Sequence, residues 1–439
     1  MEIVSEHGGN IYRLAEELKI QERRIIDFSA SINPLGVSKK IKAELRKHLR
    51  YLHNYPDPDT KRLRKRLAQY HGIDPEMILC GNGSTELIYL ITRVLRPQKV
   101  LIPAPTFSEY ERACHTSSEL RVLSYELKRE NNFEINPDEF INAMEGKLPN
   151  PPLPPFTKGG HGGINHSSLI THHPSLPCDM AFLCNPNNPT GRLLKKDAVL
   201  KIAKAAKELK CYLIVDEAFI DFCNPPLPPF TKGGQGGIIK KGGIPNGTVP
   251  DFVVSAQSND LPTERSEVVE SGLSHIPSPT IIGNVHDNPY LIVLRSMTKF
   301  YALSGLRIGY GVFPQHLIGR LKEYKEPWTV NSLAQRAAVV VLKDRVYRNE
   351  TFKLLKEEKR FLENGFRKIG IEFFHSDANF YLLKISNANE ICQQLKKKGI
   401  LVRDCSNFKG LDRTYIRVAV KSHRENTILI KELARILRK

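Results

Sequence analysis

The stretch Met180–Phe219 constrains the fold of this chain most, because it contains two strand patterns separated by a helix pattern. The apolar runs Met180–Cys184 and Tyr212–Val215 predict buried strands, and KKDAVLKIAKAAKELK between them predicts an amphipathic helix. Strands joined in this way form a parallel pair with a right-handed crossover. Polar residues follow both strands, as Asn185–Gly191 and as Asp216. Ligands of open parallel sheets bind at such strand ends, so the stretch predicts an α/β fold with a site at this edge.

A third strand end carries a candidate nucleophile. The run LIVL at 291–294 predicts a buried strand, followed by Ser296, Lys299 and Arg307. A lysine desolvated at a strand end has a lowered pKa and can form a Schiff base. The neighbouring hydroxyl and guanidinium groups could hold a phosphate, and this combination suits pyridoxal 5′-phosphate. Taken alone, Lys299 could equally be one of many surface lysines.

Three further features lie earlier in the chain. A short strand at 77–80 runs into the Gly-rich turn Gly81–Glu86 and then a helix, which presents backbone N–H groups to an anion. The turn lacks the Gly-Lys-Ser/Thr of a Walker A loop. Phe107 follows another strand and could stack on a flat ring or pack in the core. Tyr55 stands before a proline in a connector, where a structural role is common.

The C-terminal part alternates helices and short strands. We expect helix from about 314 to 370, strands at 380–385, 400–403 and 414–420, and a terminal helix. Arg403 and Arg417 stand in apolar strand patterns, where a guanidinium group needs an anionic partner. That partner could be a core acid or the carboxylate of a substrate.

Composition is that of a soluble globular protein of two domains. The chain has 439 residues, 41% of them hydrophobic, and a net charge of +18. The basic residues are spread along helix patterns and mixed with Glu, so solvated helix faces explain them better than nucleic-acid binding. The eight cysteines show no metal-ligand spacing. We expect a cytoplasmic protein with reduced cysteines, no bound metal, no signal peptide and no membrane span.

Two nearly identical blocks interrupt this pattern. Residues 150–164 and 224–238 differ only at His161 and Gln235, and both are rich in Pro and Gly. Such segments form neither helix nor strand interiors. We interpret them as low-complexity inserts, about 147–176 and 224–288, that loop out of the fold. A proline-rich docking ligand is the functional alternative.

The motifs together resemble the pyridoxal-phosphate enzymes of fold type I, the aminotransferase class I/II superfamily. The resemblance rests on their order along nearly the whole chain apart from the inserts. It implies a large domain with a mixed, mostly parallel sheet flanked by helices, and a smaller α+β domain. The expected boundaries are an N-terminal arm with part of the small domain at 1–50, the large domain at 51–315 and the small domain at 316–439.

The resemblance also implies a role for each motif residue. Lys299 would form the Schiff base with the cofactor, Asp216 would pair with its pyridine nitrogen, and Asn188 would bind its 3′-oxygen. Phe107 would stack on the ring, and Arg417 would grip the substrate carboxylate. The cofactor phosphate would be bound by Asn82, Gly83, Ser84, Ser296 and Arg307. Tyr55 would reach the cofactor of a neighbouring subunit, which implies a homodimer. Many relatives have tyrosine where this chain has Phe219.

Within the superfamily, several strings are similar to the threonine-phosphate decarboxylases of cobalamin biosynthesis. They are HGGN, DFSASINPLG, VDEAFIDF and GILVRDCSNFKGL…YIRVAVKSHREN. This likeness implies decarboxylation of L-threonine O-3-phosphate, with Arg403 contributing to the phosphate contact. His7, Asn10 and Asn33 would close over the substrate from the N-terminal arm. Histidinol-phosphate aminotransferase shares NPNNPTG and SxxK and is the alternative. An inactive scaffold and a basic nucleic-acid-binding protein are the alternatives outside enzymes.

Overall fold

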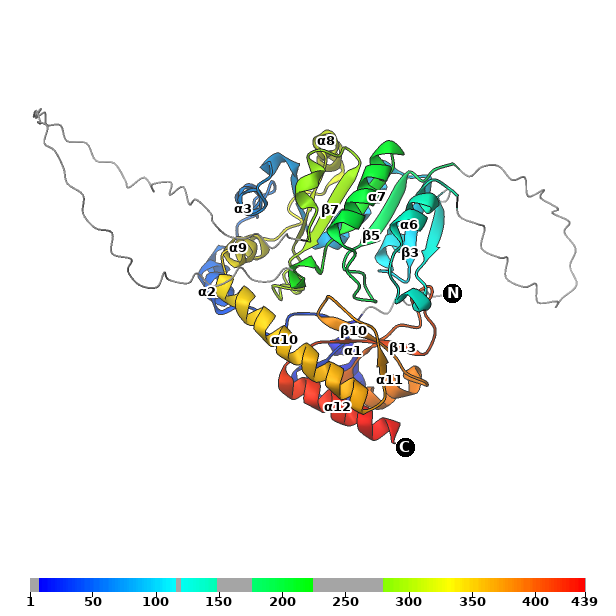
Figure 1. The fold of residues 1–439 in the computed structure, drawn as a ribbon. Coiled ribbons are helices and arrows are strands. Elements are labelled where there is room, and N and C mark those ends of the chain that lie inside the picture. Colours follow the sequence, from blue (N-terminus) through cyan, green and yellow to red (C-terminus); the bar gives the residue numbers. More distant parts are fainter. Residues whose placement is uncertain (1–7, 116–119, 148–175, 224–278, 439) are drawn as a thin grey trace, which may run out of the picture. The chain divides into compact units, whose positions relative to one another are not determined.

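The computed structural model describes residues 8–115, 120–147, 176–223 and 279–438. Its central element is a seven-stranded sheet with the strand order β2-β8-β7-β6-β5-β3-β4 (Figure 1). The strands are β2 (Ile78–Gly81), β3 (Lys99–Ala104), β4 (Arg121–Glu126), β5 (Met180–Cys184), β6 (Tyr212–Asp216), β7 (Leu291–Ser296) and β8 (Gly309–Val312). Only β8 runs antiparallel to its neighbours. The predicted mixed, mostly parallel sheet is therefore confirmed.

Helices cover both faces of this sheet. The described helices are α1 (Ile11–Leu18), α2 (Lys39–His48), α3 (Lys61–His71), α4 (Ser84–Leu95), α5 (Glu109–Cys114), α6 (Pro137–Met144), α7 (Lys196–Glu208), α8 (Gln315–Tyr324), α9 (Ser332–Val341), α10 (Arg345–Lys368), α11 (Ala388–Lys396) and α12 (His423–Leu437). Alternate residues of one strand point to opposite faces. On β5, Phe182 packs with α4, α5 and α8, whereas Leu183 packs with α6 and α7. Burial on both faces explains why the central strands are continuously apolar.

A second sheet has the order β12-β13-β10-β9 and is antiparallel. Its strands are β9 (Glu372–Phe373), β10 (Phe380–Lys384), β12 (Arg403–Asp404) and β13 (Tyr415–Ala419). Helices α10 and α12 pack against each other beside it (Figure 1). The N-terminal arm joins this part of the chain, because β1 (Ile26–Asp27) pairs with β11 (Ile400–Leu401).

The structure differs from the sequence prediction in two places. The helix expected over 314–370 is three helices, because Pro327 interrupts it and the side chains of Asn331 and Asp344 cap new helix starts. The second insert was expected to end at about 288. Ile281, Ile282 and Val285 are instead buried in the core, so its last ten residues belong to the fold. Most of both inserts lies outside the described residues, and the domain boundaries stay a prediction.

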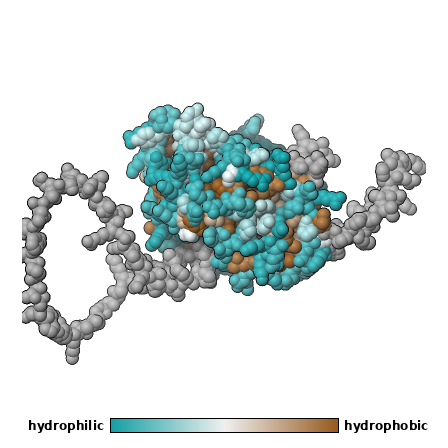
Figure 2. All heavy atoms as spheres, turned by 90° about the horizontal axis from the view of Figure 1, so that it is seen from above, coloured by the Kyte–Doolittle hydropathy of each residue, from teal (hydrophilic) through white to brown (hydrophobic). Residues whose placement is uncertain are grey.

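The surface is mainly hydrophilic, with hydrophobic residues in small separate patches on the face shown in Figure 2. The basic residues on helices α2, α3 and α10 lie largely on exposed positions, and those of α10 are interspersed with glutamates. Among the helices that the structure describes, none is both long and apolar enough to cross a membrane.

Candidate active site

The motif residues gather at one edge of the seven-stranded sheet. Strands β2, β3, β5, β6 and β7 are parallel to one another, so their carboxyl ends lie at this edge, and antiparallel β8 begins there. The register places Cys184 beside Asp216 and Ser296 beside Gly309. The segments that follow these strands therefore meet, as the sequence predicted.

Lys299 lies three residues beyond the end of β7. Part of its side chain is accessible, yet burial is the largest cause that lowers its pKa, to about 8. The positive charges of Arg417 and Arg307 lower the pKa further, whereas Asp27 and Asp216 raise it. About a tenth of Lys299 is therefore neutral and nucleophilic at pH 7, a far larger share than for an ordinary lysine, and this favours Schiff-base chemistry.

Asp216 ends β6 and is buried, which raises its pKa to about 6. Its Oδ2 accepts a hydrogen bond from the hydroxyl of Tyr110 at 2.8 Å, and its Oδ1 accepts one from the amide of Ala218 at 3.0 Å. Each carboxylate oxygen can accept a second hydrogen bond. A cationic N–H group of a bound ring would stabilise the charged carboxylate and counteract the effect of burial.

The start of helix α4 forms a tight cradle. Gly83 has φ +79°, and a Cβ built on it would lie 2.6 Å from Nη2 of Arg307. Arg307 itself adopts the left-handed conformation, with φ +57°. A Cβ on Gly309 would overlap the amide nitrogen of Ser84. The free amides of the helix start and the guanidinium of Arg307 therefore lie close together, which suits a phosphate.

Ser296 and Asn82 flank this cradle. The hydroxyl of Ser296 lies 2.7 Å from that of Thr298. The backbone amide of Asn82 donates to the carboxylate of Glu86, and its side chain is exposed. Glu86 also forms an ion pair with Lys325 at 3.1 Å, which ties the turn to the chain after α8.

Arg417 of β13 reaches the large sheet from the second one. Its Nη1 donates to Oδ1 of Asn188, and its Nη2 donates to the carbonyl of Ser29 at 2.7 Å. Its Nε has no partner among the described residues. Burial lowers its pKa to about 10, so the group remains charged at neutral pH. The desolvated cation, with an unused donor, fits a carboxylate.

Arg403 lies directly opposite Arg417, because β12 and β13 pair these two residues. Both residues are buried. Arg403 donates to the carbonyl of Asp404 and to Oδ1 of Asn407 at 2.8 Å, and its guanidinium lies over the ring of Phe408. The positive charge of Arg403 is one cause of the lowered pKa of Arg417.

The remaining predicted residues lie in different settings. The amide nitrogen of the buried Asn33 side chain donates to the carbonyl of Phe300 at 2.8 Å and to Thr351 at 2.7 Å. Asn10 caps helix α1, where its side chain accepts from the amide of Arg13. His7 lies outside the described residues. The substrate contacts predicted for these three residues stay a prediction.

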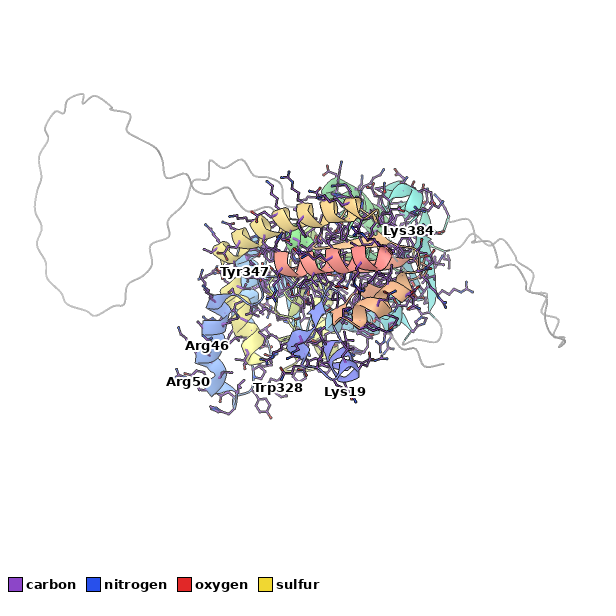
Figure 3. The ribbon with its side chains drawn as sticks, turned by 90° about the horizontal axis from the view of Figure 1, so that it is seen from below. Lys19, Arg46, Arg50, Trp328, Tyr347 and Lys384 are labelled. Carbon is purple, nitrogen blue, oxygen red and sulfur yellow. The ribbon has the colours of Figure 1, made fainter. Side chains whose placement is uncertain are left out.

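Three aromatic residues of the predicted set also differ in setting. Phe107 is half-buried, and its ring lies 5.5 Å edge-on from that of Tyr110. Phe219 is buried with its ring 5.0 Å from that of Phe380, which in turn lies beneath Arg417. Tyr55 is 82% exposed, with its ring 5.1 Å from that of Trp328. Figure 3 shows Trp328 at the rim of the molecule, on the same side as Arg46 of α2 and Arg50, which follows this helix.

Three contributors to this site were not predicted from the sequence. Tyr110 was not distinguished from other helix residues, although it bonds to Asp216 across 106 positions. Ser29 holds Arg417 through its backbone, which no side-chain pattern reveals. Gly309 received no role from the sequence, yet the start of α4 packs where its side chain would lie. A glycine at the start of an otherwise apolar strand was the available signal.

These residues fit a flat, phosphate-bearing aldehyde. The cradle at Gly83 and Arg307 suits a phosphate. The amine of Lys299, with its lowered pKa, suits an aldehyde. The carboxylate of Asp216 can accept further hydrogen bonds and suits a protonated ring nitrogen. The fold and this site together define a pyridoxal-phosphate enzyme of fold type I.

Comparison with known proteins gives the family. The chain belongs to the family of class I and II aminotransferases, whose profile matches residues 23–433. The threonine-phosphate decarboxylase of Salmonella typhimurium is 32% identical over 436 residues, which cover 99% of this chain and 97% of that protein. The histidinol-phosphate aminotransferase of Caldanaerobacter subterraneus is 28% identical, with 87% and 84% covered.

A solved structure supports the same assignment. The histidinol-phosphate aminotransferase of Clostridium acetobutylicum superposes with a TM-score of 0.70 at 26% identity, covering 94% of this chain and 99% of that one. Enzymes of this family depend on pyridoxal 5′-phosphate, so the expected fold and cofactor are confirmed.

Proposed function

We propose that the protein decarboxylates L-threonine O-3-phosphate to (R)-1-aminopropan-2-yl phosphate, a reaction of cobalamin biosynthesis. The observation that carries the proposal is the direct pairing of Arg403 with Arg417 in neighbouring strands. Two buried guanidinium groups at opposed positions repel each other, and a substrate with two anionic groups relieves that repulsion. The full-length similarity to a threonine-phosphate decarboxylase supports the same substrate.

The residues of the site have separate tasks in this reaction. Pyridoxal phosphate, when bound, supplies an electron sink for the pair released at the Cα atom of the substrate. Asp216 holds the proton on the ring nitrogen, and Tyr110 fixes the orientation of that carboxylate. Lys299 binds the cofactor before the substrate arrives. After carbon dioxide has left, Lys299 or water delivers a proton to Cα.

The two arginines decide which bond at Cα is broken. Arg417 binds the carboxylate and Arg403 contributes to the phosphate contact, so the substrate is held at both ends. Holding the substrate at both ends would select the bond from Cα to the carboxylate for cleavage in decarboxylation, whereas transamination would need the bond from Cα to hydrogen to be selected. Asn188, which accepts from Arg417, links the carboxylate-binding group to the loop expected to hold the cofactor 3′-oxygen.

The site is completed by a second copy of the chain in this proposal. Tyr55 is largely exposed and rests against Trp328, which leaves its hydroxyl accessible to a partner subunit. We expect a homodimer in which Tyr55 reaches the partner's cofactor phosphate. We further expect a cytoplasmic enzyme, since all eight cysteines are free thiols.

The buried Phe219 affects which residues can form hydrogen bonds to the cofactor 3′-oxygen. Its ring packs against Phe380 and offers no hydroxyl. Hydrogen bonding to the 3′-oxygen therefore falls to Asn188 alone among the predicted ring contacts. We expect Phe219→Tyr to change the pH dependence of the cofactor absorbance without abolishing turnover.

Histidinol-phosphate aminotransferase is the second candidate, favoured by the structural similarity to such an enzyme. The two activities are separated by their products. The purified protein is incubated with threonine phosphate alone, and separately with histidinol phosphate and 2-oxoglutarate, while carbon dioxide and glutamate are both measured. The proposal predicts carbon dioxide in the first reaction and no glutamate in the second. Glutamate without carbon dioxide would establish the aminotransferase.

A further inference from the structure

Asp27, at the end of β1, organises a turn beside Arg417. Its Oδ1 accepts hydrogen bonds from the amide of Ser29 at 2.8 Å, the hydroxyl of Ser29 at 2.6 Å and the amide of Ala30 at 3.2 Å. Three donors on one oxygen fix the backbone of the turn. Asp27 has no role in the reaction as proposed above.

Ser29 uses this turn to connect three parts of the chain. Its carbonyl accepts the hydrogen bond from Nη2 of Arg417 at 2.7 Å, and its hydroxyl accepts one from the amide of Gly9 at 2.7 Å. A Cβ on Gly8 would overlap the same carbonyl. The described part of the N-terminal arm, at Gly8 and Gly9, therefore packs on the residue whose carbonyl group orients Arg417.

The charge of Asp27 faces the cations of the site. Burial lowers the pKa of Lys299, Arg417 and Lys421, and the charge of Asp27 opposes this lowering in each case, whereas Arg417 and Arg307 lower the pKa of Lys299 further. Asp216 is a second carboxylate whose charge acts on Lys299. Asp27 and Asp216 thus counterbalance the positive charges around Lys299 from different elements.

We propose that Asp27 is a positioning residue, which fixes Arg417 through the carbonyl of Ser29 and holds a negative charge in the turn that contacts this cation. The geometry assigns it two separable properties. The acceptor oxygen shapes the turn, and the negative charge acts on the lysine. The first property concerns binding of a substrate carboxylate, so it rests on the function proposed above. The second does not depend on which substrate is used.

The chain offers a matched control for a purely structural turn. Oδ1 of Asp412 accepts hydrogen bonds from the amide of Thr414 at 2.8 Å and from the hydroxyl of Thr414. Asp27 and Ser29 make the same two contacts, and in both pairs the residues are two positions apart in the sequence. Asp412 is exposed, and its charged neighbours are Lys384 and Arg129 instead of the cations of the site. Removing Asp412 therefore reports the loss of such a turn alone.

The charge is tested on the apoenzyme by competitive labelling of Lys299. Trace acetic anhydride is applied from about pH 6 to about pH 10, and the labelled peptide is quantified by mass spectrometry. In the unaltered protein the midpoint is expected at about 8. Asp27→Asn should move this midpoint to lower pH, because the neutral amine is favoured once the carboxylate is gone, whereas Asp412→Asn should leave it in place. An unmoved midpoint in Asp27→Asn, or equal movement in both variants, overturns the proposal.

The turn is tested by comparing Asp27→Ala with Asp27→Asn. Asparagine keeps an acceptor for the amides of Ser29 and Ala30, and alanine does not. The KM for threonine phosphate should rise roughly tenfold more in Asp27→Ala than in Asp27→Asn, with a smaller change in kcat. Asp412→Ala shows how much a loss of stability alone changes KM, and its melting temperature is measured alongside. Equal KM values in Asp27→Ala and Asp412→Ala would mean that Asp27 only stabilises the fold.

The two tests also separate this inference from the proposed function. If threonine phosphate is not a substrate, the labelling experiment still decides whether Asp27 acts on Lys299. If threonine phosphate is a substrate but neither the midpoint nor the KM depends on Asp27, the decarboxylase stands and the positioning role is rejected.

Discussion

Replacing Gly83 by alanine should weaken cofactor binding by a predictable amount. The added Cβ would lie 2.6 Å from Nη2 of Arg307, so the guanidinium has to move away from the start of α4. A charge-assisted hydrogen bond contributes about 1.5–3 kcal/mol. Loss of one such contact to the cofactor phosphate raises the Kd for pyridoxal phosphate roughly ten- to a hundredfold.

A second effect of the same substitution concerns stability. Gly83 has φ +79° and ψ 164°, a conformation that is nearly restricted to glycine and that strains other residues by about 1–3 kcal/mol. This strain is present with and without cofactor, so it lowers the free energy of unfolding and leaves Kd unchanged. The two effects can therefore be measured separately.

Two other glycines provide matched controls. Gly72 has φ +69° with open space around its Cβ position, and Gly305 lies near Arg307 with open space and no positive φ. Gly72→Ala should lose stability but keep cofactor affinity, and Gly305→Ala should keep both. The assay is absorbance titration of each apoenzyme with pyridoxal phosphate, together with thermal unfolding. If the Gly83→Ala protein binds pyridoxal phosphate as tightly as the Gly72→Ala protein does, the start of α4 and Arg307 do not form the phosphate site.

Four further predictions follow from the site. Lys299→Ala should abolish both turnover and borohydride-trapped cofactor on the protein; labelling of another lysine in the unaltered enzyme would reject this residue as the nucleophile. Capture of pyridoxal phosphate by the apoenzyme should accelerate about tenfold per pH unit up to the pKa of Lys299 near 8 and then level off, because only the neutral amine reacts; stopped-flow absorbance at several pH values measures this. Arg403→Ala should raise the KM for threonine phosphate roughly ten- to a hundredfold but hardly change the KM for threonine. An equal rise in KM for both substrates would contradict a contact between Arg403 and the phosphate. Replacing residues 150–164 or 227–278 by a short Gly-Ser linker should leave cofactor affinity intact, and a folded variant that binds no cofactor would contradict the interpretation of both segments as inserts.

The strand-end residues could be predicted because their signals are local. Asp216 and Lys299 each follow a continuous apolar run, and Gly83 opens a helix after such a run. Periodicity identifies the strand, and parallel pairing brings the strand ends together. These positions needed no knowledge of distant contacts.

Other parts of the site depend on contacts between distant segments. The bond from Tyr110 to Asp216 spans 106 positions, and the bond from Arg417 to the carbonyl of Ser29 spans 388. Tyr110 is one aromatic residue among many on helices, and a backbone carbonyl leaves no mark in the sequence. The direct opposition of Arg403 and Arg417 depends on strand register, which a pattern of apolar residues suggests but does not define.

The most direct test of the proposed reaction is the fate of Cα in heavy water. The enzyme is incubated with threonine phosphate and pyridoxal phosphate in deuterium oxide, and the amine product is analysed by mass spectrometry. Decarboxylation followed by proton delivery to Cα predicts aminopropanol phosphate with a single carbon-bound deuterium and an equal amount of carbon dioxide. Recovery of threonine phosphate that carries deuterium at Cα, with no carbon dioxide, would show that the enzyme breaks the bond to hydrogen and would contradict the proposal.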